Sequence, residues 1–154
     1  MAEIIIGQYQ GTSFFSKLIK WRTWSNISHT GAFLGDDVIE AWGGGVVRQH
    51  WTSGHEPGTK ITLYRVPCLD KQWEIFYSFL LHQVGKKYDK MGILGFMTRA
   101  KSQHPDKWFC SELVFAAAKE AGIDLLARIE PYQVSPGQLD TSPILEFVEN
   151  RICP

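Results

Sequence analysis

The sequence is poor in cysteine, and its three cysteines form neither a disulfide framework nor a zinc site. Cys68, Cys110 and Cys153 are widely spaced and odd in number among 154 residues. A disulfide-rich secreted domain carries an even set at short spacings, so a reducing compartment is the simpler interpretation. None of the three pairs with histidines at the spacing typical of structural zinc sites. The role of each cysteine therefore depends on its own surroundings in the sequence.

An excess of either charge is also missing. The chain has 16 basic and 16 acidic residues, which give a formal net charge of +0. Because nucleic-acid binding needs a basic excess or stripe, no nucleic-acid partner is expected. A hydrophobic content of 44% and an aromatic content of 13% are typical of a folded globular protein. The length predicts a single domain over residues 1–154.

Long apolar runs are absent. No stretch approaches the roughly 18 apolar residues of a membrane-spanning helix, so no integral membrane segment is expected. Residues 1–20 lack the basic start, apolar stretch and cleavage site of a secretory signal. We therefore expect a cytoplasmic protein, or one delivered or released by a non-Sec route. The sequence predicts no oligomeric state.

The apolar pattern predicts a strand-rich first half followed by helices. Strands are expected at residues 3–6, closed by Gly7, in the runs HTGAFLG and DDVIEAW, in TKITLYRVP with a stop at its proline, and near the end of the chain. Helices are expected at residues 13–24, 70–85 and 110–122, with residues 86–97 as a loop. This order predicts an α+β fold, with a small antiparallel sheet or barrel packed against helices.

Cys110 stands at the start of a predicted helix, in the stretch WFCSELVFAAAKEAG. The thiolate is the nucleophilic form of cysteine, and the partial positive charge of a helix N-terminus stabilises it. The alternative is a buried structural cysteine, which is the commoner case for an isolated residue. Cys110 is therefore a candidate nucleophile that needs a base from elsewhere in the chain.

His29 is the candidate base, and Glu40 the residue that could orient it. If the hairpin pairs Leu34 with Asp37, His29 lies diagonal to Glu40 on one face of the sheet. Gly31 would leave the space between them open. A shift of one residue would move Glu40 to the other face. Taken alone, a histidine at a strand start is more often a hydrogen-bonded structural residue, and a carboxylate such as Glu40 is more often a solvated one on a strand.

These segments together resemble the motifs of NlpC-type papain-like cysteine peptidases. The stretch from His29 to Ala41 is similar to the pattern HxGhhhGxxxhxxA, GKKYD to a G-x-x-Y-D segment, and SPGQL to an SPGDL loop. Because the histidine block precedes FCSELV, the order resembles that of the circularly permuted YiiX/YebB-like branch, which is related to lecithin retinol acyltransferase. The similarity extends from about Gly7 to the end of the chain. Gln138 replaces the aspartate of SPGDL.

The resemblance implies a permuted papain-like fold and a thiol mechanism that needs no metal or organic cofactor. It implies that Cys110 is the nucleophile and His29 the general base. Glu40 would orient His29. Tyr88 would lie beside the cysteine and help to hold the oxyanion.

The substrate is less well defined than the chemistry. Trp42 and Trp108 flank the proposed catalytic segments and could line a substrate groove. Cleavage of an amide in short or cell-wall-type peptides is the first expectation, and a polar groove with an arginine or lysine would favour it. A lipid acyl hydrolase or acyltransferase, favoured by an apolar rim, and a non-catalytic binding module with an unreactive thiol are the alternatives. Surface or loop positions are expected for the remaining histidines, His50, His55, His82 and His104.

Overall fold

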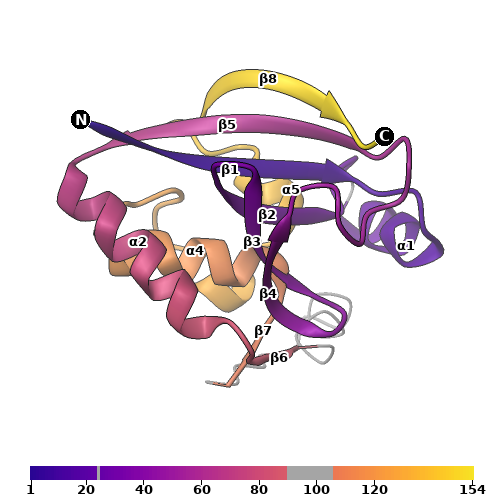
Figure 1. The fold of residues 1–154 in the computed structure, drawn as a ribbon, viewed down its shortest axis with the longest axis horizontal. Coiled ribbons are helices and arrows are strands. Elements are labelled where there is room, and N and C mark those ends of the chain that lie inside the picture. Colours follow the sequence, from indigo (N-terminus) through magenta and orange to yellow (C-terminus); the bar gives the residue numbers. More distant parts are fainter. Residues whose placement is uncertain (24, 90–105) are drawn as a thin grey trace.

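The protein is built on one six-stranded antiparallel sheet with helices packed against it (Figure 1). The computed structural model describes residues 1–23, 25–89 and 106–154. The spatial order of the strands is β4-β3-β2-β1-β5-β8. Their bounds are β1 Ala2–Gln10, β2 His29–Leu34, β3 Asp37–Trp42, β4 Gly45–His50, β5 Lys60–Cys68 and β8 Glu146–Ile152. The predicted α+β class and antiparallel sheet are confirmed.

The helices are contributed mainly by the second half of the chain. They are α1 Phe14–Thr23, α2 Asp70–Gln83, α4 Cys110–Glu120 and the short α5 Pro136–Leu139, which follows the 3-10 turn η1 Pro131–Gln133. A short parallel pair joins β6 Lys87–Tyr88 to β7 Lys107–Trp108. Figure 1 shows α2 and α4 side by side against the sheet.

The larger core lies between the sheet and these two helices. Ile6, Ala32 and Ile39 from the sheet pack there with the buried face of α4, which includes Ala117 and Ala118. Small side chains allow a helix to approach a sheet closely. The predicted packing of the alanine-rich helix on the sheet is therefore confirmed.

The opposite face of the sheet carries a second, smaller core. Its buried members are Tyr9, Phe33, Val38, Ile61, Leu63 and Cys153. Side chains alternate between faces along a strand. His29 and Glu40 are in phase with Phe33 and Val38, so they belong to this second face.

Two strands extend further than the sequence predicts. β1 continues past Gly7 to Gln10. A Cβ atom on Gly7 would lie 2.4 Å from the ring of Phe33, so this glycine admits a cross-strand aromatic ring and does not end the strand. Pro67 lies inside β5, opposite Glu3 of β1, and beyond the residues of β5 that pair with β8. A proline is tolerated there because that side of the strand needs no donor.

Three other predictions differ in detail. In the segment expected to be a loop at 86–97, Lys87 and Tyr88 form β6, and residues 90–97 lie outside the described part of the chain. The helix expected over residues 70–85 ends at Gln83, and Val84 beyond it is exposed. The SPGQL segment forms the short helix α5 instead of a loop.

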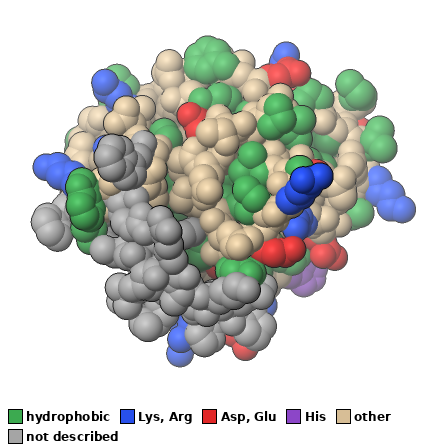
Figure 2. All heavy atoms as spheres, turned by 180° about the vertical axis from the view of Figure 1, so that it is seen from behind, with side chains coloured by type: hydrophobic (Ala, Val, Ile, Leu, Met, Phe, Trp, Pro, Cys, Tyr) green, Lys and Arg blue, Asp and Glu red, His purple; other side chains and the backbone are tan. Residues whose placement is uncertain are grey.

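The surface agrees with the balanced composition. On the face drawn in Figure 2, basic and acidic side chains are interspersed. Among the described residues, no helix is both long and apolar enough to cross a membrane.

Candidate active site

The hairpin of β2 and β3 has the predicted register and brings His29 to Glu40. Leu34 pairs with Asp37, across a turn in which Gly35 has a φ of 65°. Nε2 of His29 lies 2.5 Å from Oε2 of Glu40, and the carboxylate is fully buried. A carboxylate can only accept a hydrogen bond, so Nε2 of His29 is the donor.

Gly31 lies against Val38 and Glu40 of the neighbouring strand. A Cβ atom on Gly31 would lie 3.5 Å from Cβ of Glu40, an ordinary van der Waals distance, and 2.5 Å from Cγ2 of Val38, which is too close. Glycine is therefore required here by Val38.

Cys110 is the first residue of α4, and its thiol lies close enough to His29 to influence the imidazole. A hydrogen bond with this thiol and the thiol's charge both act on the imidazole. Because Nε2 of His29 is bonded to Glu40, Nδ1 is the ring nitrogen left to face the sulfur. The structure therefore brings together Cys110, His29 and Glu40 in the order thiol, imidazole, carboxylate.

The electrostatics of the site favour a protonated imidazole. Burial acts to lower the pKa of His29, but the charges of Glu40 and Cys110, with hydrogen bonds to both, outweigh it and raise the pKa from 6.5 to about 10. Burial acts to raise the pKa of Glu40, but the charge and hydrogen bond of His29 hold it below its usual range. At neutral pH an imidazolium therefore lies between an ionised carboxylate and the thiol.

The first turn of α4 is fixed by buried polar contacts. The hydroxyl of Ser111 donates to the carbonyl of Val134 at 2.6 Å. The carboxyl of Glu112 accepts from the backbone N–H of Phe109 at 3.4 Å. These bonds hold the start of the helix, and with it the position of the sulfur.

The segment that resembles SPGDL has a structural part in this arrangement. Gln138 Oε1 accepts from the N–H of Ser135 at 2.8 Å, and Ser135 Oγ accepts from the N–H of Gln138 at 3.2 Å. This reciprocal pair is a capping box, in which glutamine is a regular member. The carbonyl of Pro136 accepts from Gln8 of β1 at 2.8 Å, which joins α5 to the sheet, while Val134 just before it accepts from Ser111 of α4.

Tyr88 is held in the parallel pair of short strands. It lies opposite Trp108 in the β6–β7 ladder, and the N–H of Asp89 donates to the carbonyl of Trp108 at 2.8 Å. Burial, followed by the charge of Cys110, raises the pKa of the Tyr88 hydroxyl. The Tyr88 hydroxyl is therefore near enough to the Cys110 thiol to be influenced by its charge.

A cavity of about 320 Å³ opens beside these residues. It is lined by Tyr9, Gly11, Ser13, Ser16, Ile19, Ser28, His29, Trp42, Gly43, His55 and Tyr88. Cys110 is 3% exposed and does not line the cavity, although its neighbours His29 and Tyr88 do. The sulfur is therefore reached past these two side chains.

The two tryptophans predicted to line a groove have different surroundings. Trp42 lines the cavity, and its ring centroid lies 4.8 Å from that of His29. Trp108 lies outside the cavity lining, because its Nε1 donates to Gln83 of α2 at 3.1 Å and its ring meets Phe79 edge-on. Trp108 therefore joins β7 to α2.

His55 is a site residue that the sequence does not reveal. A surface or loop position is expected for it, and it does lie in the loop between β4 and β5, but its side chain is only 3% exposed. Its Nε2 lies 3.1 Å from each carboxylate oxygen of Glu40, and its ring stacks on Tyr9 at 4.4 Å. Gly54, with a φ of 76°, passes close to Trp42 in the loop that places it. His50 and His82 are exposed, and His104 lies outside the described residues.

Gln49 completes the surroundings of the carboxylate. Its amide Nε2 donates to Oε1 of Glu40 at 2.9 Å and to the carbonyl of Ser53 at 3.0 Å. Glu40 therefore accepts hydrogen bonds from His29, His55 and Gln49. Among these residues, His29, Glu40 and His55 also offer ligand atoms that all lie within 4.8 Å of one another, a spacing that could hold a metal ion.

One solved structure is similar over almost the whole chain. The crystal structure of the metalloprotein YiiX from Escherichia coli O157:H7 matches with a TM-score of 0.74 and 23% sequence identity, over 99% of this chain and 98% of that chain. The chain has a YiiX-like fold. No protein-family model matches the sequence, and neither does any curated protein. The resemblance to YiiX-like proteins is therefore supported for the fold, while the relation to papain-like peptidases and lecithin retinol acyltransferase rests on motifs alone.

Proposed function

We propose that the protein is a cysteine hydrolase of permuted papain-like fold, in which Cys110, His29 and Glu40 act together. The observation that carries this proposal is an imidazole held between a buried carboxylate, 2.5 Å from its Nε2, and a thiol at the start of α4. This arrangement supplies a nucleophile, a base and an orienting group, which are the parts that covalent acyl transfer needs.

In the proposed reaction, the thiolate of Cys110 attacks a carbonyl carbon and forms a tetrahedral intermediate. The bond to the leaving group breaks as His29 gives it a proton, and a thioester remains on the sulfur. His29 then takes a proton from water, which attacks the thioester and releases the acid and the free thiol. The backbone N–H of Cys110 and the hydroxyl of Tyr88 are the proposed donors to the oxyanion.

The cavity favours a substrate with an apolar acyl group. Its described lining contains no lysine or arginine, and the imidazolium of His29 is already paired with Glu40. A short cell-wall-type peptide carries carboxylates, and burying them without an unpaired cation would be unfavourable. We therefore place lipid-like acyl esters and amides ahead of acidic peptides as substrates.

Substrate class can be tested with activated acyl compounds. We expect faster hydrolysis of p-nitrophenyl esters as the acyl chain lengthens from acetate to octanoate, and little cleavage of a short acidic peptide anilide. The Cys110→Ser variant corrects for spontaneous ester hydrolysis. Efficient cleavage of the acidic peptide, with no dependence on acyl length, would reverse this order of substrates.

A non-catalytic binding module is the second candidate, and the burial of Cys110 is the observation that favours it. The same cavity would then hold a ligand without forming a thioester. The two candidates differ in the reactivity of the thiol, because a thiolate beside an imidazolium reacts quickly with an alkylating agent near pH 6 and a buried neutral thiol does not.

The deciding experiment is mass spectrometry of the intact protein after brief treatment with iodoacetamide near pH 6. Cys68 and Cys153 are internal controls, because both are buried and burial raises the pKa of each thiol. We expect one modification, at Cys110, which is lost in His29→Ala. Equal labelling of all three thiols would contradict the hydrolase, and an unreactive Cys110 in the folded protein would support the binding module.

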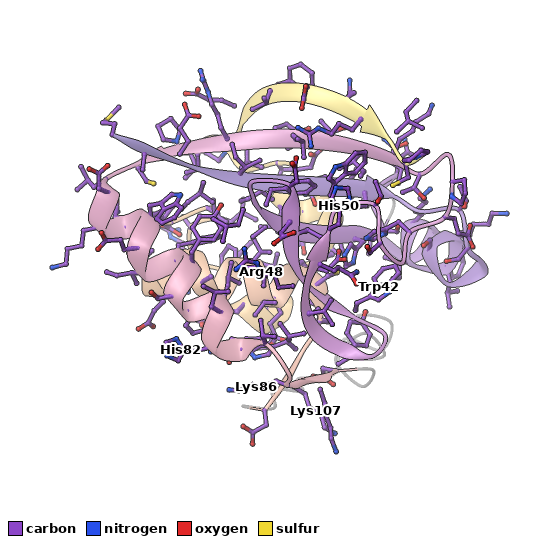
Figure 3. The ribbon with its side chains drawn as sticks, in the orientation of Figure 1. Trp42, Arg48, His50, His82, Lys86 and Lys107 are labelled. Carbon is purple, nitrogen blue, oxygen red and sulfur yellow. The ribbon has the colours of Figure 1, made fainter. Side chains whose placement is uncertain are left out.

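His82→Ala is the matched control for the histidine variant. His82 is exposed on α2, and Figure 3 shows it well apart from Trp42, which lines the cavity. We expect this variant to label at the same rate as the unmodified protein.

A further inference from the structure

Three metal-ligating side chains meet at the base of the cavity, and the proposed hydrolase uses only two of them. Glu40 carries two imidazoles on one carboxylate, with Nε2 of His29 at 2.5 Å and Nε2 of His55 at 3.1 Å. The side chains of all three are at most 6% exposed. Glu40 can orient His29 without His55, so the second buried imidazole on this carboxylate needs another explanation.

We propose that His29, Glu40 and His55 bind a divalent transition-metal ion, with Zn²⁺ as the best match, and that the bound ion switches off the Cys110–His29 pair. The binding site stands independently of the hydrolase. The switching rests on the proposed function.

The ligand set selects the class of ion. Two imidazole nitrogens and one carboxylate oxygen suit zinc and similar transition metals, whereas calcium and magnesium prefer oxygen ligands. Zinc–ligand distances of about 2.0–2.2 Å place neighbouring donor atoms roughly 3.2–3.5 Å apart. The donor atoms of the cluster are spaced from 2.5 Å to within 4.8 Å, so the ion fits after side-chain shifts of about 1 Å.

The surroundings favour an ion at this position. Tyr9 and Trp42 pack on the ring of His55, with centroids 4.4 and 4.6 Å away, and restrict its movement. Gln49 holds Oε1 of Glu40, as an outer partner of a metal-ligating carboxylate does. His29 and His55 both line the cavity, so an ion has a path of entry and room for a further ligand.

The bound ion would change what His29 can do. It takes the place of the protons that the two Nε2 atoms donate to Glu40. With the lone pair of Nε2 on the metal, His29 keeps its remaining proton on Nδ1 and can no longer form the imidazolium that protonates a leaving group. Metal binding and acyl transfer therefore exclude each other at this imidazole.

The binding is tested with protein that has been dialysed against EDTA and then titrated with Zn²⁺ in a calorimeter. We expect one ion per chain and no binding of Mg²⁺. His55→Gln keeps an amide donor for Glu40 but removes a ligand, and we expect its affinity to fall by at least about a hundredfold. Unchanged affinity in folded His55→Gln would overturn the site, and so would a failure of the unmodified protein to bind. His82→Gln is the control and should bind normally.

A second variant separates this site from the thiol. Zinc also binds thiolates, so Cys110→Ser is titrated in parallel, and we expect its affinity to be equal to or higher than that of the unmodified protein, because the thiol that favours the protonated imidazole is gone. Loss of binding in Cys110→Ser would place the ion on the sulfur and overturn the proposal. A rise in the unfolding temperature with Zn²⁺, seen in the unmodified protein and absent in His55→Gln, gives an independent measure.

The switch is tested by the rate at which iodoacetamide modifies Cys110. We expect saturating Zn²⁺ to slow this rate in the unmodified protein, and EDTA to restore it. Zinc that binds without changing the rate would overturn the switch but leave the binding site. A thiol that is unreactive even without zinc, in a protein that still binds the ion, would contradict the hydrolase and not the metal site.

Discussion

Gly31 lies next to Glu40 on the neighbouring strand, and a Cβ atom on this glycine would come within 3.6 Å of the carboxylate oxygen that His29 contacts. The same atom would overlap Val38 at 2.5 Å. We expect Gly31→Ala to lower the free energy of unfolding by about 1–3 kcal/mol, as overpacking does in other proteins, and to slow alkylation of Cys110. Urea denaturation and the iodoacetamide assay measure the two effects.

Gly44→Ala is the matched control for this substitution. A Cβ atom on Gly44 meets nothing within 4 Å. We expect Gly44→Ala to change stability by less than about 0.5 kcal/mol, as is usual at the surface. Equal losses in the two variants would show that the space at Gly31 is not tightly filled.

The hydrogen bond from Gln49 to Glu40 is predicted to stabilise the fold more than the exposed ion pair between Arg48 and Asp37. Gln49→Leu removes a donor from a buried, ionised carboxylate, and we expect a loss of about 1.5–3 kcal/mol in urea denaturation. Arg48 pairs with Asp37 at 2.8 Å, but both side chains are more than a third exposed. Arg48→Ala should therefore change stability by less than about 1 kcal/mol. The reverse ranking would show that Gln49 does not support Glu40.

Glu112 is predicted to make stability fall as pH rises. Burial, which outweighs the hydrogen bond from Phe109, raises the pKa of Glu112 from 4.5 to about 8. A carboxyl that binds its proton more tightly in the folded state stabilises the fold below its unfolded pKa, and that contribution is lost as pH rises towards 8. The slope for this group is at most about 1.4 kcal/mol per pH unit.

Glu112→Gln tests this pH dependence. Glutamine keeps an oxygen for the Phe109 N–H but cannot ionise. We expect the variant to match the unmodified protein near pH 5 and to be more stable near pH 9, in urea denaturation at both values. The same pH profile for both proteins would show that Glu112 is ionised without penalty in the fold.

Tyr88 is predicted to act on turnover and not on thiol reactivity. Removing one oxyanion donor lowers kcat by about 10²–10³ in hydrolases. Alkylation forms no oxyanion, so Tyr88→Phe should lose ester hydrolysis and still label at Cys110. Tyr132→Phe, in η1 and outside the cavity lining, should keep both activities. If Tyr88→Phe loses the labelling of Cys110 together with ester hydrolysis, Tyr88 supports the structure of the site and is not an oxyanion donor.

The sequence predicts the hairpin and the start of α4 well, because local chemistry determines both. Gly35 sets the turn, the turn sets the pairing of Leu34 with Asp37, and the two-residue alternation of strands then places His29 and Glu40 on one face. The predicted strand ends at Gly7 and Pro67 were wrong. Whether a glycine or a proline ends a strand depends on the residue that it faces on the neighbouring strand.

His55 could not be predicted because it lies in a loop without apolar periodicity. Its position depends on how the loop between β4 and β5 folds back onto Trp42 and Tyr9. These two residues belong to other strands, so the sequence around His55 does not indicate the contact. Trp108 packs against α2 because of a tertiary contact with Gln83. The sequence around Trp108 does not predict this contact either. Both residues show that loop and strand-end positions are set by packing partners.

The imidazole and the carboxylate come from a single hairpin, whereas the sulfur comes from a helix much later in the chain. The hairpin can assemble early, since its turn is short, but bringing the helix to it requires closing a long stretch of polypeptide. In the proposed hydrolase, a chain whose synthesis stops before the helix would thus lack Cys110, the sulfur that attacks the substrate. The proposed activity would then appear only once the polypeptide is nearly finished.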